Sequence, residues 1–238
     1  MSVLPDLSHR NLQPELMDQP DLDPKTHRKA LSGLRRINFL SGSVGILWPA
    51  IRRLAEKTAA ERIRVLDIGS GGGDLAIALW KKSRRHSIPL EIVGVDISDV
   101  AVESARTQAK QTDARVQFEV CDALTQPLPD DFDVVMCSLF LHHMQEPEAV
   151  QLLRTMAAAA NRLVLVNDLR RCATGYWLAI AACHLFTRSH IVHVDGPRSV
   201  AGAFTIAEVH ALCDRAELEN IRIQRRWPFR YLLSWERV

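Results

Sequence analysis

The sequence lacks the features that mark membrane-spanning, secreted and disulfide-bonded proteins. Its most apolar window, residues 176–186, is about half of the ~20 residues that a membrane span needs, and it contains His184. Residues 1–24 are polar and hold no apolar signal core. The five cysteines form no C-x-x-C pair, so we expect buried, reduced thiols and no metal site. These absences favour a cytoplasmic protein without stable membrane insertion and leave a lipid-facing patch open.

A strong net charge is also missing. The 30 Lys and Arg residues nearly balance the 28 Asp and Glu residues, which gives a formal charge of +2. Nucleic-acid binders usually concentrate basic residues on one face, so this balance disfavours a nucleic-acid partner. With 47% hydrophobic and 24% charged residues among 238, the chain has an ordinary globular composition and suits one domain with elaborations.

The middle of the chain alternates short apolar runs with helical patterns. We expect strands at 63–68, 90–95, 116–120, 132–137 and 163–166, with helices at 75–82, 98–111 and 147–159. A helix at 206–216 and strands at 220–225 and 229–235 follow. Nearly continuous apolar strands alternating with helices are typical of a parallel sheet covered on both faces. The sequence therefore predicts an α/β fold with a doubly wound, mostly parallel, seven-stranded sheet.

Two segments lie outside this alternation. Residues 1–60 are predicted to form a loose arm over residues 1–24 and a cap of two helices, 24–40 and 44–59, before the main domain at 61–238. Residues 168–204 carry a predicted helix at 172–187 and then a histidine-rich loop with glycine and proline. Ligands of such sheets bind beyond the carboxyl ends of the strands. We therefore expect residues 168–204 to be an insertion that covers the substrate.

The strongest local signal is a glycine-rich turn at 69–73, between the first predicted strand and a helix. Glycines permit positive φ and let a ligand approach the backbone. The dinucleotide fingerprint G-x-G-x-x-G fits at Gly69 and Gly71, but Asp74 takes the place of the third glycine, where its carboxylate would repel a pyrophosphate. Asp96, after the second strand, is placed to hold a ribose diol, and Asp67 is placed to meet the ammonium of an amino-acid-like ligand.

These residues resemble the motifs of class I S-adenosylmethionine-dependent methyltransferases. Asp67-x-Gly69-x-Gly71-x-Gly73 resembles their first motif, and the segments 94–98 and 121–123 resemble the second and third. The segments 132–135 and 138–143 resemble the fourth motif and the loop after it. The resemblance implies a Rossmann-like fold with S-adenosylmethionine as the cofactor. The cofactor-binding residues that it implies are Asp67, Gly69, Ser70, Gly71, Asp96, Ile97, Asp122, Ala123 and Ser138.

A finer resemblance concerns the substrate. The segments 15–18, 34–38 and 195–199 resemble small-molecule methyltransferases of bacterial phenolic-lipid and polyketide pathways. The implied partner is a small hydrophobic or aromatic molecule that is methylated on a hydroxyl or a carbon. The apolar, aromatic residues of 176–186 suit such a substrate, and they suit packing on the core equally well.

His142 and His143 are the predicted catalytic residues. They follow the fourth strand at the ligand-binding end of the sheet, where a neutral imidazole can accept the proton of a phenol or hydroxyl near neutral pH. One of the pair could instead pack or cap the next helix. His193 with Asp195 is an alternative oriented base, or a solvated loop.

Three other functions stay open from the residues alone. A nicotinamide- or flavin-dependent oxidoreductase is disfavoured by Asp74. A macromolecule methyltransferase is disfavoured because no Asn/Asp-Pro-Pro-aromatic motif follows the fourth strand. A non-catalytic S-adenosylmethionine-binding protein is compatible with the intact binding motifs. The oligomeric state is not determined, and a homodimer is compatible with the sequence.

Overall fold

A computed structural model describes residues 6–18, 22–40, 42–58 and 61–237. Residues 1–5 and 19–21 of the predicted arm and residue 59 of the predicted second helix lie outside the described residues, as do the side chains of residues 34–36 and 38. The elements, in chain order, are η1 (Leu16–Asp18), α1 (Pro24–Leu40), α2 (Ser43–Thr58), β1 (Ile63–Ile68), α3 (Asp74–Arg85), β2 (Leu90–Asp96), α4 (Asp99–Gln111), β3 (Val116–Val120), β4 (Phe132–Ser138), η2 (Leu141–His143), α5 (Glu146–Ala159), β5 (Ala160–Leu169), α6 (Ala173–Phe186), α7 (His190–Gly202), α8 (Ile206–Arg215), β6 (Arg222–Arg226) and β7 (Arg230–Glu236).

The seven strands form one sheet in the order β3-β2-β1-β4-β5-β7-β6. The first five strands in this order are parallel, and β7 pairs antiparallel with both β5 and β6. The order reverses at β1, where β2 lies on one side and β4 on the other, which is where doubly wound sheets bind their ligands. The predicted fold class and the seven strands are confirmed.

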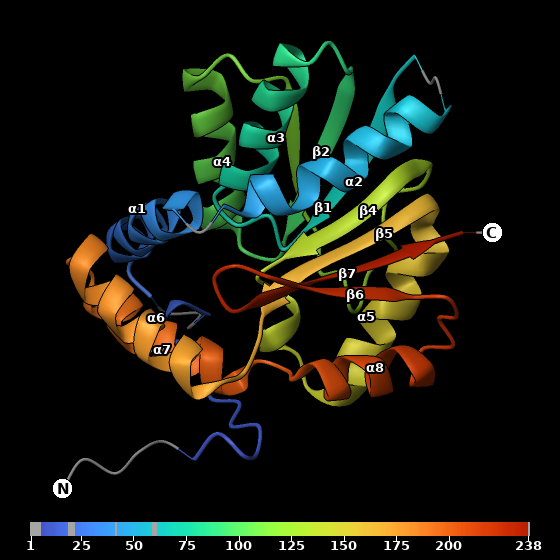
Figure 1. The fold of residues 1–238 in the computed structure, drawn as a ribbon. Helices are drawn as coiled ribbons and strands as arrows, with labels where there is room; N and C mark the ends of the chain where they lie inside the picture. The colour runs from blue at the N-terminus through green and yellow to red at the C-terminus, as the bar shows by residue number, and fades with distance from the viewer. Residues whose placement is uncertain (1–5, 19–21, 41, 59–60, 238) are drawn as a thin grey trace, which may run out of the picture.

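The central strands are buried on both faces because helices cover both (Figure 1). In β1, Leu66 and Ile68 pack towards α5 and α8, whereas Val65 packs towards α2, α3 and α4. The near-continuous apolar runs of the sequence follow from this arrangement, since consecutive side chains of a strand point to opposite faces. The two cores fix the carboxyl ends of β1, β2, β4 and β5 at one edge of the sheet.

A third group of helices lies beyond that edge. Helices α1, α6 and α7 pack on one another at the left of Figure 1, and α7 also contacts η1 and η2. Their shared core includes Ala30, Cys183, Ile191 and Val192. Within the described residues, each helix is too short or too polar to cross a lipid bilayer.

The predicted histidine-rich loop is wrong, because residues 190–202 form helix α7. Glycine and proline usually interrupt helices, but here Gly196 permits close packing of α7 on α6. A Cβ at Gly196 would lie 2.4 Å from the Sγ of Cys183. Burial of Ile191, Val192 and Val200 accompanies this packing and outweighs the local preference.

The prediction of a loose arm is also wrong for residues 6–18, which pack against the domain. Arg10 donates hydrogen bonds to the carbonyl oxygens of Gly202 (2.5 Å) and His142 (2.8 Å). The backbone N–H groups of Leu16 and Met17 donate to the carboxylate of Asp195 at 2.8 and 3.0 Å. The polar composition of the arm predicts exposure to solvent, but these groups form hydrogen bonds with residues far along the chain instead.

Candidate active site

The turn between β1 and α3 depends on glycines in the left-handed region. Gly69, Gly71 and Gly73 have φ values of 66°, 52° and 78°, which other residues adopt only with strain. A Cβ at Gly69 would lie 2.4 Å from the ring of Phe140, so this glycine also permits a close contact with the loop after β4. A Cβ at Gly71 would meet no atom within 4 Å, and this part of the turn therefore faces open space.

Asp96 joins the end of β2 to this turn. Its Oδ2 accepts a hydrogen bond from the backbone N–H of Gly71 at 2.8 Å, and its Oδ1 accepts one from Ser98 at 2.9 Å. These two hydrogen bonds fix the carboxylate of Asp96 beside the turn. Ile97, beside it, is 68% exposed and presents an apolar side chain.

Asp67 is a buried carboxyl group at the end of β1. Its side-chain Oδ2 has no hydrogen-bond partner in the structure. Burial, together with the nearby charge of Asp96, raises the pKa of Asp67 to about 8. A buried acceptor without a partner is rare in folded proteins and calls for a ligand or an ion. An ammonium group would satisfy this oxygen.

The remaining predicted cofactor residues differ in how they are held. Asp122 accepts hydrogen bonds from the N–H of Leu124 (3.0 Å) and the hydroxyl of Thr125 (2.6 Å), and these bonds hold its pKa below the ordinary value. Its carboxylate thus closes its own turn. Ala123 is buried, and the Ser138 hydroxyl accepts a hydrogen bond from the Asn167 side chain at 2.8 Å.

The two histidines follow β4 in the short helix η2. His142 is buried, and its Nδ1 lies 2.7 Å from the Oδ1 of Asp168 at the end of β5. Burial disfavours the charged form of Asp168, but the charge of His142 and the hydrogen bonds of His142 and Leu169 outweigh it and lower the pKa of Asp168. The ring of His143 stacks on that of His142 with centroids 4.3 Å apart.

One large cavity brings these groups together. Its volume is about 1320 Å³, and helices α1, α6 and α7 contribute to its wall, as does Glu15 of the arm. All the predicted site residues line it: Asp67, Gly69, Ser70, Gly71, Asp96, Ile97, Asp122, Ala123, Ser138, His142 and His143. The alternative base does not form, since His193 Nε2 lies 2.9 Å from the carbonyl oxygen of Thr187 and Asp195 binds the arm.

Residues 65–162 match a family model described as a methyltransferase domain. These residues therefore resemble a methyltransferase domain, in agreement with the class I motifs of the sequence. Their match contains the strand ends from Asp67 to His143 that form the cavity wall.

Curated proteins that are similar to this chain are methyltransferases by name. Over 127 residues the chain is 28% identical to a ubiquinone biosynthesis O-methyltransferase of Methylococcus capsulatus, covering 52% of this chain and 51% of that protein. It is 40% identical over 86 residues to the 27-O-demethylrifamycin SV methyltransferase of Amycolatopsis mediterranei, covering 35% and 30% of the two chains. The chain thus matches about half or less of the length of these two relatives.

A solved structure shares the fold of the methyltransferase domain with its flanking helices. The magnesium protoporphyrin IX methyltransferase of Synechocystis PCC 6803, crystallised with S-adenosylmethionine, superposes with a TM-score of 0.58 at 18% identity. The likeness covers 92% of this chain and 100% of the other. At this identity it shows the fold alone.

Sequence reasoning about the methyltransferase domain missed three residues of the site. Asp168 holds His142, Phe140 lies over Gly69, and Glu15 approaches both histidines. A polar pair, Asn167 and Asp168, at the end of the apolar fifth strand was the signal for Asp168. The resemblance of residues 15–18 to other methyltransferases included Glu15 but gave it no role, because its contacts are made by residues far along the chain.

Proposed function

We propose that the chain is an enzyme that transfers a methyl group from S-adenosylmethionine to a hydroxyl, or a carbon, of a small hydrophobic or aromatic molecule. The observation that carries the proposal is that the unpartnered carboxyl oxygen of Asp67 and the histidine pair line one cavity. The relatives named as ubiquinone biosynthesis O-methyltransferases support a hydroxyl acceptor.

The residues present fit the cofactor. Asp67 would pair with its ammonium group, the carboxylate of Asp96 would accept hydrogen bonds from its ribose hydroxyls, and Gly71 leaves the space for it. When bound, the cofactor supplies a methyl group activated by the sulfonium charge. The proposed cofactor-binding residues are Asp67, Gly69, Ser70, Gly71, Asp96, Ile97, Asp122, Ala123 and Ser138.

His142 and His143 are the proposed catalytic residues at the acceptor end of the cavity. Asp168 fixes the ring of His142, so its Nε2 is held towards the arm and the cavity. We propose that this pair binds the acceptor hydroxyl and promotes the loss of its proton. Fixed orientation of reacting groups can supply ~7–11 kcal/mol of a bimolecular barrier.

The helices around the cavity would exclude water and select the substrate. We propose that residues 1–60 act as arm and cap, that 61–238 form the methyltransferase domain, and that 168–204 cover the substrate. Leu22, Leu31 and Ile37 from the cap, with Ala179 and Val200 from the insertion, give the cavity apolar walls. Such walls favour an acceptor with an aromatic ring or acyl chain.

The test begins with cofactor binding, which needs no known acceptor. In isothermal titration we expect the wild type to bind S-adenosylmethionine and S-adenosylhomocysteine. Asp96→Ala should weaken both by about 10- to 100-fold through the lost hydrogen bonds of a charged group. Asp130→Ala, an exposed carboxylate outside the cavity lining, is the matched control. If the wild type binds neither nucleoside, the proposal is overturned.

A screen for transfer of a labelled methyl group then identifies the acceptor class. Phenols, quinols and acyl resorcinols are the first set. Equal rates of methyl transfer for wild type and Asp96→Ala would contradict the proposed cofactor site.

The cytoplasmic location and the homodimer stay predictions. Light scattering on the purified chain measures the oligomeric state.

A further inference from the structure

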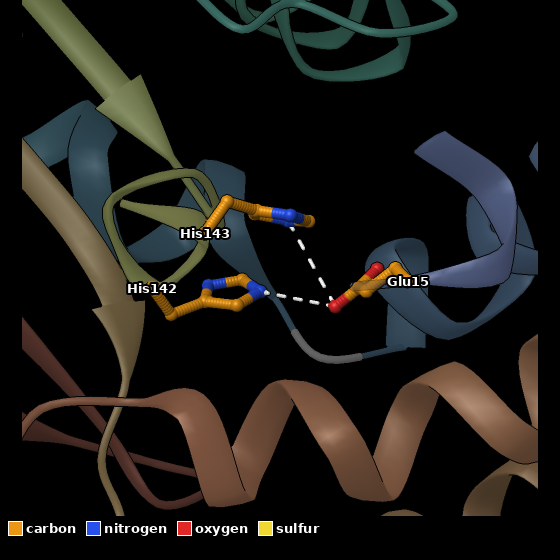
Figure 2. Close-up of side chains that lie close together, drawn as sticks. All are labelled: Glu15, His142 and His143. Carbon is orange, nitrogen blue, oxygen red and sulfur yellow. Dashed lines mark ion pairs between the residues drawn. The ribbon is translucent and has the colours of Figure 1, made fainter. Parts of the chain in front are cut away.

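Three metal-ligating side chains converge beside the cavity. Figure 2 shows the imidazoles of His142 and His143 pointing towards Glu15, which the N-terminal arm brings against them. The Nε2 atoms lie 3.8 Å (His142) and 4.0 Å (His143) from the same Glu15 oxygen, Oε1. All three ligand atoms lie within 4.8 Å of one another. These separations are too long for direct hydrogen bonds.

The orientation of the His142 ring makes this convergence significant. Its Nδ1 lies 2.7 Å from Oδ1 of Asp168, which also accepts a hydrogen bond from the backbone N–H of Leu169, so Nδ1 is the nitrogen that donates. In a neutral imidazole the other nitrogen then presents its electron pair. Nε2 of His142 therefore directs an electron pair towards a buried carboxylate oxygen. A cation bound between these two electron-rich atoms, 3.8 Å apart, would stabilise both.

Neighbouring groups hold the three ligands in place. Asp168 fixes the His142 ring, as a carboxylate commonly does for a metal-bound histidine. The hydroxyl of Ser199, on α7, donates a hydrogen bond to Oε1 of Glu15, and the ring of His143 stacks on that of His142. Glu15 and His142 are buried, whereas His143 is 24% exposed. The cluster is thus constrained rather than a chance grouping of surface residues.

We propose that His142 Nε2, His143 Nε2 and the Glu15 carboxylate bind one divalent transition-metal ion. Metal–nitrogen and metal–oxygen bonds of about 2.0–2.2 Å would require the ligand atoms to shift by only a few tenths of an ångström. Two imidazoles and one carboxylate suit Zn²⁺, Co²⁺ or Fe²⁺ and leave coordination positions open. Those positions face the cavity, since all three residues line it.

The ion gives the histidines a defined task. It would attract the acceptor oxygen, and the hydroxyl proton would then leave to solvent more readily. The ion would also tie the N-terminal arm to the loop after β4 through Glu15. This use of the ion rests on the proposed function, whereas the binding of the ion does not.

The experiment titrates Zn²⁺, by calorimetry, and Co²⁺, by visible absorption, into untagged full-length protein stripped with a chelator. We expect one ion per chain, with Glu15→Gln and His143→Ala each raising Kd by at least about tenfold. His184→Ala is the matched control, since it removes one histidine from the other stacked pair, His184 and His193, and should leave Kd unchanged. Circular dichroism checks that each variant is folded.

Absence of saturable binding, or equal Kd values for wild type and both ligand variants, overturns the metal site. S-adenosylhomocysteine binding is measured on the same stripped protein, where we expect it to be retained. If that nucleoside binds and the metal does not, only this inference fails. If the metal binds and the nucleoside does not, the metal site stands and the proposed function fails.

Discussion

Asp168 holds His142 at two points. Its Oδ2 accepts a hydrogen bond from the backbone N–H of His142 at 3.0 Å, and its Oδ1 lies 2.7 Å from the imidazole Nδ1. The end of β5 therefore fixes both the start of η2 and the orientation of the ring. Because both residues are buried, a ring released from Asp168 would have few other polar partners.

The first prediction follows from this contact. Asp168→Asn keeps the size of the side chain but replaces a charged acceptor by a neutral amide. We expect the rate of methyl transfer to fall by about 10- to 100-fold, as for other residues that orient a reactive histidine. Affinity for S-adenosylhomocysteine should not change, since Asp67 and Asp96 are untouched. Asp133→Asn, at the other end of β4, is the control; equal rates in both variants would contradict the role of Asp168.

The second prediction concerns the proton on Asp67. With a pKa of about 8, this carboxyl group is mostly protonated in the free protein at neutral pH, and an incoming ammonium would favour its ionised form. Binding of S-adenosylhomocysteine should therefore release about one proton and tighten as pH rises towards 8. Calorimetry in buffers of different ionisation enthalpy measures the proton release. Asp67→Asn should bind more weakly and release none; proton release by that variant would assign it to another group.

The same shift predicts the direction of the stability change with pH. The folded-state pKa of Asp67 is raised above the ordinary 3.8, so the folded state binds the proton more tightly than the unfolded state does. Through this group, stability is greatest below about pH 4 and falls as pH rises to about 8. Thermal unfolding of wild type and Asp67→Asn across this range, without ligand, should show the smaller decline in the variant. If the melting temperatures of wild type and variant changed equally with pH, the raised pKa of Asp67 would be contradicted.

The third prediction concerns Gly69, which lies under Phe140. A methyl group at 69 would collide with the Phe140 ring at 2.4 Å, and the residue would also keep a positive φ. We expect Gly69→Ala to displace Phe140, lower the free energy of unfolding by ~1–3 kcal/mol and weaken cofactor binding. Gly45→Ala is the control because a Cβ there meets no atom within 4 Å. It should stabilise helix α2 by roughly 0.5–1 kcal/mol.

The fourth prediction compares a buried ion pair with an exposed one. Arg171 is 2% exposed and binds Glu208 through Nη1 and Nη2 at 2.9 and 2.6 Å, as well as the carbonyl oxygen of Ala203 at 2.7 Å. Removing one member of a fully buried pair costs about 3–5 kcal/mol, and exposed pairs contribute about 0–1 kcal/mol. Because the side chain of Glu208 is 35% exposed, we expect the loss of unfolding free energy in Arg171→Met to lie between these values. Denaturant unfolding of Arg171→Met and of Arg52→Met, which breaks the exposed pair with Glu56, measures the contrast. Similar losses of unfolding free energy in the two variants would contradict this prediction.

The sheet and the glycine-rich turn were predictable because their signals are local. Apolar runs mark buried parallel strands, and Gly69, Gly71 and Gly73 mark positive φ values within six residues of Asp67. Helix α7 was not predictable, since Gly196 and Pro197 interrupt helices in isolation. The helix forms because Gly196 packs against Cys183 of α6, a tertiary contact that leaves no local trace.

The partners of the histidines were hidden for the same reason. Glu15 lies on an arm whose polar composition predicts exposure to solvent. Asp168 lies at the end of a strand, where an acidic residue does not by itself indicate a contact with a histidine. Each reaches His142 only when the sheet is assembled. The site residues that sequence reasoning predicted lie at the carboxyl ends of strands and in the segments just after them, and those it missed make contacts between distant segments.

The antiparallel pairing of β7 with β5 has a consequence for synthesis of the chain. Strand β7 closes the edge of β5 and sets Tyr231 opposite Asp168 in the register. A nascent chain that has not yet emerged from the ribosome as far as β7 leaves the edge of β5 open, and open strand edges invite pairing with other chains. Asp168 therefore lies on a strand whose second edge stays open until β7 has been translated.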